Sequence, residues 1–214
     1  MRRVRASVAS FAAVALLWCT AGCGGRDSSP AAAGRSTVTV EATQTLLVLG
    51  TSATFGVGLE DSFQDAWPRI FFREAFARAT VFFNGALVNS SAADAEVNQL
   101  PLVAAVSPSV VAIWFGAEEA SLGVPAAQFA ADLADLVRRV RASGARVLLA
   151  DLPQSENTDV DAYNQAIARV AADEDATLVP LHEARISSFD RAHVLPDVAG
   201  HRAIARAFER ALRS

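Results

Sequence analysis

Lysine is absent from this 214-residue chain, and all 19 of its basic residues are arginine. The chain also carries 23 acidic residues, which gives it a formal net charge of −4. No segment gathers the arginines into the basic patch that nucleic-acid-binding surfaces need, so we expect no nucleic-acid partner. We attribute the lack of lysine itself to genomic composition rather than to function.

Cysteine is nearly absent too, because Cys19 and Cys23 are the only two and both lie near the N-terminus. Residues 1–22 have the features of a secretion signal, with three arginines followed by an apolar stretch from Val8 to Trp18. The exported domain therefore cannot contain an internal disulfide and must be stabilised by its core. Beyond this leader, no apolar run is long enough to cross a bilayer.

The leader ends in Thr20-Ala21-Gly22-Cys23, which is similar to the lipobox of bacterial lipoproteins, whose cysteine is lipidated. Residues 24–36 are small and polar, as in a flexible tether. We therefore predict a signal peptide over 1–22, a lipidated Cys23 with a tether over 23–43, and export to the cell membrane or envelope. A plain secretory signal cleaved near Ala21 and a retained signal anchor are the alternatives.

Apolar runs alternate with helical patterns over residues 44–214, which predicts one domain without repeats. The expected strands are 46–49, 81–83, 110–115, 147–150 and 177–181, and the clearest expected helices are 125–143, 159–173 and 200–212. Strands joined through helices favour right-handed crossovers. The prediction is an α/β fold, a three-layer α/β/α sandwich around a five-stranded parallel sheet.

The first apolar run ends at Gly50-Thr51-Ser52, so a buried strand places the Ser52 hydroxyl at the carboxyl edge of the sheet. Open α/β sheets build their active sites at this edge. Ser52 is therefore a candidate nucleophile. The alternative is an ordinary strand-to-helix turn in which Ser52 only hydrogen-bonds the next helix.

From about Thr45 to its C-terminus, the chain resembles the SGNH, or GDSL, family of serine hydrolases. The resemblance rests on the order and spacing of Gly50-Thr51-Ser52, Trp67, Asn84-Gly85-Ala86, Gly116, Gly123-Val124-Pro125, Gly144 to Val147, Tyr163-Asn164 and Pro196 to His201. It implies a flavodoxin-like fold, Ser52 as the nucleophile, a small acyl-ester substrate or ligand, and no cofactor.

The chain departs from the family pattern at the reactive positions. Thr51 replaces the aspartate before the serine, Asn89 replaces a glycine whose N–H helps form the oxyanion hole, and Glu118 replaces the asparagine that completes it. Glu119 then stands where an aspartate is usual. An ionised glutamate only accepts hydrogen bonds and repels an oxyanion, although a protonated one could donate. Losing one oxyanion donor costs about 10²–10³ in rate.

The last family block, an Asp-x-x-His, can be aligned in two ways. The local pattern gives Asp190 and His193, with His193 as general base and Asp190 as its orienting partner. Counting back from Pro196 and Gly200-His201 instead puts Ala192 and Leu195 at those positions, which removes the triad.

Two main functions compete. In the first, Ser52 attacks an ester carbonyl, His193 and Asp190 move its proton, and the backbone N–H groups of Ser52 and Asn89 hold the oxyanion. In the second, the chain is a catalytically inactive member of the fold that acts as a binding or scaffolding lipoprotein. In a third hypothesis, the chain is a hydrolase with altered chemistry in which Glu118 or Glu119 is the base.

The remaining polar candidates have structural explanations. We expect His201 to be a capping or surface group on the last helix and His182 to be structural. We expect Glu118 and Glu119 to form a solvated acidic loop rather than a metal site, because no recognised ligand spacing is present. The substrate and the oligomeric state stay open at this point.

Overall fold

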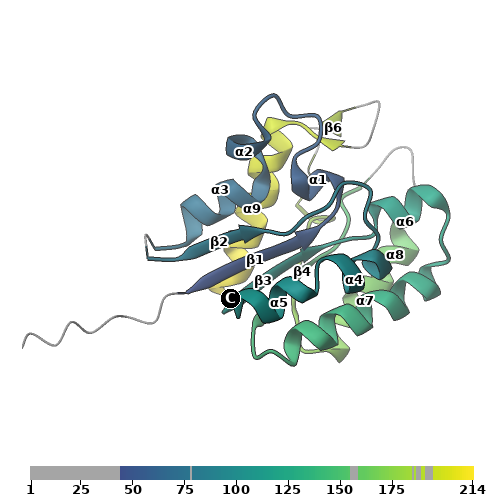
Figure 1. Ribbon diagram of the computed structural model, residues 1–214. Coiled ribbons are helices and arrows are strands. Elements are labelled where there is room, and N and C mark those ends of the chain that lie inside the picture. The colour runs from purple at the N-terminus through teal and green to yellow at the C-terminus, as the bar shows by residue number, and fades with distance from the viewer. Residues whose placement is uncertain (1–43, 78, 155–158, 185, 187–188, 191–194) are drawn as a thin grey trace, which may run out of the picture. The chain divides into compact units, whose positions relative to one another are not determined.

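The computed structural model describes residues 44–214 apart from 78, 155–158, 185, 187–188 and 191–194, and the described residues belong to one compact unit (Figure 1). The predicted signal peptide, the lipidated Cys23 and the tether therefore lie outside the described residues and stay predictions. Within the described part of the chain, no helix is both long and apolar enough to cross a bilayer.

The central element is a sheet of five parallel strands in the order β2-β1-β3-β4-β5. The strands are β1 (Thr45–Gly50), β2 (Val81–Asn84), β3 (Val110–Trp114), β4 (Arg146–Ala150) and β5 (Thr177–Val179). The interior strands β1, β3 and β4 are almost wholly buried, which explains their continuous apolar runs. The predicted fold class is confirmed.

Helices cover both faces of this sheet, which gives the three predicted layers (Figure 1). The helices α3 (Trp67–Ala75) and α9 (Val198–Arg213) pack together on one face. The other face carries α4 (Ala92–Asn98), α5 (Pro101–Val106), α7 (Ala126–Arg141) and α8 (Asp161–Asp173). The predicted helices correspond to α7, α8 and α9.

Several short elements lie outside the strands and helices that we predicted. They are the helices α1 (Ser52–Phe55), α2 (Ser62–Asp65) and α6 (Ala117–Leu122), and the antiparallel pair β6 (Phe189–Asp190) and β7 (Leu195–Pro196). Helices this short have no apolar periodicity and depend on the surrounding structure for their stability. For that reason the sequence pattern alone did not predict them.

His201 links the two helices on one face of the sheet. It lies in α9, is fully buried, and its Nδ1 accepts the backbone N–H of Trp67 at 3.1 Å, at the start of α3. The Trp67 ring in turn stacks on Phe208 of α9, with ring centroids 4.2 Å apart. We expected His201 to be either a capping group or a surface group. It is a capping group, and it does not lie on the surface. Burial lowers the pKa of His201 to about 4, opposed in part by the charge of Asp197.

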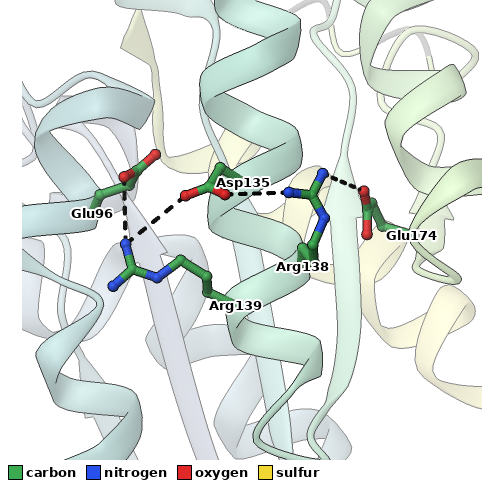
Figure 2. Close-up of polar contacts among 5 residues, drawn as sticks. All are labelled: Glu96, Asp135, Arg138, Arg139 and Glu174. Atoms are coloured by element: carbon green, nitrogen blue, oxygen red, sulfur yellow. Dashed lines mark hydrogen bonds and ion pairs between the residues drawn. The ribbon is translucent and has the colours of Figure 1, made fainter.

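Ion pairs on α7 connect it to neighbouring elements on the protein surface (Figure 2). Arg139 contacts Glu96 of α4 at 3.4 Å, and Arg138 contacts Glu174 at the end of α8 at 2.8 Å. Asp135 lies between the two arginines, 3.2 Å from Arg138 and 3.9 Å from Arg139. Because both arginines are more than half exposed, each pair contributes about 1 kcal/mol or less.

Candidate active site

The candidate site lies where the order of the strands reverses. From β1 the chain goes to β2 on one side, whereas β3 pairs with β1 on the other side. Ligands bind at such switch points, beyond the carboxyl ends of the strands. Ser52, Asn89 and Glu118 come from the segments that follow β1, β2 and β3, and the structure brings these three predicted site residues together.

Ser52 is the first residue of α1, which begins immediately after β1. This sharp connection requires glycine at position 50, because a Cβ there would lie 2.3 Å from the Thr54 Oγ1 one turn into the helix. The close approach fixes Ser52 at the edge of the sheet. Ser52 is only 6% exposed.

The Ser52 hydroxyl has a polar partner on two sides. Its Oγ accepts the backbone N–H of Asn89 at 3.0 Å and donates to Glu118 Oε1 at 2.7 Å. Asn89 Oδ1, at 3.3 Å, is an alternative and longer acceptor. Asn89 has φ 57°, a conformation in the left-handed region that glycine adopts freely and asparagine tolerates better than most residues. The backbone donor that we predicted at Asn89 is thus directed at the nucleophile.

Glu118 also contacts the second residue that departs from the family pattern. Its Oε1 accepts the hydroxyl of Thr51 at 3.1 Å in addition to that of Ser52. Glu118 is half-buried in the first turn of α6. Thr51 and Glu118, two departures from the family pattern that are far apart in the sequence, therefore form one hydrogen-bonded pair beside Ser52.

Glu119 has a different environment, and the expectation of a solvated acidic loop is wrong for it. It is 3% exposed and accepts the backbone N–H groups of Ala92 at 2.7 Å and Gly116 at 3.0 Å. Burial raises the pKa of Glu119, opposed by these hydrogen bonds and reinforced by the charge of Glu118. Glu119 thus joins the segment that carries Asn89 to the segment that carries Glu118.

The predicted base and its partner are only partly within the described residues. His193 and Ala192 lie outside them, so neither alignment of the last block is tested and both stay predictions. The backbone of Asp190 in β6 pairs with Leu195 in β7. Leu195 is half-buried, packs on the core, and lies on a strand that contacts α1.

His182 lies elsewhere on the sheet edge, after β5. Its backbone N–H donates to Asp151 Oδ1 at 2.9 Å, and its Nδ1 lies 3.2 Å from the Asn164 amide. Because β5 is three strands from β1, about 14 Å at the usual strand spacing, His182 fits the structural role we expected. Burial raises the pKa of Asp151. In the described part of the chain, no three His, Cys, Asp or Glu side chains are grouped as for a metal ion.

Sequence reasoning missed Gln99, which supports the strand that ends before Ser52. Its buried amide accepts the Gly50 N–H at 3.0 Å and donates to the Gly50 carbonyl at 2.9 Å and to Ser90 Oγ at 3.0 Å. No sequence signal points to this contact. Glu119 did have one, because a glutamate at the third position of a helix can accept the backbone N–H of the N-cap residue, here Gly116.

Comparisons with known proteins identify the family. Residues 48–203 match the model of the GDSL-like Lipase/Acylhydrolase family. The chain is 30% identical over 146 residues to Esterase TesA of Pseudomonas aeruginosa, which covers 65% of this chain and 71% of that protein.

Solved structures resemble the fold over most of its length. A crystal structure of TesA aligns with TM-score 0.71 and 25% identity, covering 79% of this chain and 98% of that one. The psychrotrophic esterase EstA from Pseudoalteromonas aligns with TM-score 0.67 and 18% identity, covering 79% and 97%. A mutant of Axe2, an acetylxylan esterase from Geobacillus stearothermophilus, aligns with TM-score 0.65 and 17% identity, covering 79% and 94%.

Proposed function

Because the chain belongs to the GDSL-like lipase/acylhydrolase family, we propose that it hydrolyses small acyl esters and that Ser52 is the nucleophile. The observation that carries the proposal is the Ser52 hydroxyl, held at the switch point between the Asn89 N–H at 3.0 Å and the Glu118 carboxylate at 2.7 Å. Because the Asn89 N–H lies beside the nucleophile, it is a candidate donor to the acyl oxygen that becomes negatively charged during attack.

The proposed enzyme is exported and anchored to the cell membrane or envelope through a lipid on Cys23. The lipobox-like sequence and the polar segment after it support the anchor, which would leave the domain free to meet substrate near the membrane surface. The family resemblance assigns the proton acceptor to His193 and its orienting partner to Asp190, and this assignment stays a prediction.

Turnover of short p-nitrophenyl esters by the purified protein tests the proposal. We expect hydrolysis above a heat-denatured control, and we expect Ser52→Ala to reduce it to that background. Ser143→Ala is the matched control, because the Ser143 hydroxyl donates to a carbonyl at the end of α7 and takes no part in the site. Hydrolysis that Ser52→Ala does not reduce would contradict the assignment.

The second candidate function is an inactive binding or scaffolding lipoprotein. It is favoured by one feature, the carboxylate of Glu118 where the family has an oxyanion-stabilising amide, because an ionised carboxylate opposes the developing charge. If wild-type protein hydrolyses no ester in the assay, this function replaces the first.

A further inference from the structure

We propose that Glu118 is a catalytic residue that accepts the proton of Ser52 when Ser52 attacks the ester. This inference rests on the proposed function, and it gives the role of proton acceptor to Glu118 instead of His193, the residue to which the family resemblance assigns it. It starts from the short contact between Glu118 Oε1 and Ser52 Oγ, 2.7 Å, which is within the range of a general base and its nucleophile.

The carboxylate is held in place for this role. Its Oε1 accepts the Thr51 hydroxyl at 3.1 Å as well as that of Ser52. The start of α6 is fixed in turn by Glu119, which accepts the N–H of Gly116 at 3.0 Å. An aspartate at position 51 would place a second negative charge beside Glu118, whereas Thr51 donates a hydrogen bond. The two substitutions are therefore complementary, which random loss of function does not predict.

The reaction balances with these groups alone. As Ser52 Oγ bonds to the carbonyl carbon, Glu118 takes the hydroxyl proton and the carbonyl oxygen becomes an oxyanion, to which Asn89 N–H donates. The tetrahedral intermediate then expels the alcohol, which receives the proton from Glu118. Water attacks the acyl-Ser52 ester in the same way, so that a carboxylic acid is released and both side chains return to their starting states.

This role also removes the electrostatic objection to a glutamate at this position. A carboxylate that stayed ionised beside the oxyanion would repel it. When Glu118 accepts the proton, it becomes neutral as the acyl oxygen becomes negative, so the net charge of the site does not change. The negative charge moves from one group to its neighbour within a partly buried site, where charge is costly to create.

Substitutions of Glu118 by amides give the decisive experiment. If Glu118 is the proton acceptor, Glu118→Gln and Glu118→Asn both lower kcat for p-nitrophenyl acetate by at least about 100-fold, with a much smaller change in KM. Glu96→Gln, the same chemical change at a surface ion pair on α4, is the control. Unchanged melting temperatures separate this loss from unfolding.

If Glu118 only weakens the oxyanion hole, the amide variants restore a donor and become faster, by up to about 10²–10³. Equal or faster turnover in Glu118→Gln, with turnover still dependent on Ser52, overturns this inference but leaves the proposed function intact. Absence of Ser52-dependent turnover in the wild type overturns both.

Discussion

Replacing His201 with asparagine should make the stability of the protein less sensitive to acid. His201 is fully buried, and burial lowers its pKa to about 4. In the unfolded chain its pKa returns to about 6.5. The unfolded state therefore binds more protons than the folded state between about pH 6.5 and pH 4, and protonation of His201 favours unfolding throughout this window.

The size of the effect follows from the pKa difference. A gap of about 2.5 pKa units corresponds to about 3 kcal/mol of folding free energy, lost progressively as the pH falls from 6.5 to 4. About 2 kcal/mol of this loss is already present at pH 5. Asparagine has an amide oxygen that can still accept the Trp67 N–H but does not titrate, so this part of the loss disappears in the variant.

Urea unfolding of both proteins at pH 7, 6 and 5 measures the difference. His201→Asn lowers the free energy of unfolding at pH 7, because the smaller side chain leaves a cavity. The wild type should then lose about 2 kcal/mol more than the variant between pH 7 and pH 5. Other groups with shifted pKa values, such as Asp94 and Asp151, are shared by both proteins and cancel in the comparison. Parallel curves over this range would refute the assignment of acid sensitivity to His201.

Two further predictions concern the membrane anchor and the support of the site. In cells fed radiolabelled palmitate, Cys23→Ser should abolish labelling and move the protein to the soluble fraction, while Cys19→Ser should leave both unchanged; labelled Cys23→Ser protein would contradict the anchor. Gln99→Leu should lower the free energy of unfolding by about 1–3 kcal/mol, because it leaves the Gly50 N–H without its buried acceptor. An unchanged urea midpoint for Gln99→Leu would contradict this.

The sheet and the long helices could be predicted from the sequence because their signals are local. The strand from Thr45 to Gly50 is a continuous apolar run, and α7 has an amphipathic period over its whole length. The nucleophile position followed from the same logic, since Ser52 comes directly after that strand. Such features depend on residues that are close together in the sequence, so a sequence pattern can predict them.

The contacts of the site could not be predicted, because they join residues that are far apart in the chain. Glu118 and Ser52 are 66 positions apart, and the hydrogen bond of His201 reaches back 134 positions to Trp67. Two adjacent glutamates in a sequence predict a solvated segment. The fold instead buries Glu119 between two backbone donors while it brings Glu118 to the serine. Tertiary packing, not local pattern, decided these roles.

The most direct measurement of the central claim is covalent labelling of the wild-type protein with a fluorophosphonate, followed by mass spectrometry of its peptides. Acyl-ester hydrolysis through Ser52 predicts one adduct per chain, located on Ser52 and absent from the Ser52→Ala variant. An unlabelled wild-type protein, or an adduct on another residue that persists in Ser52→Ala, would contradict the claim that this chain is a serine hydrolase.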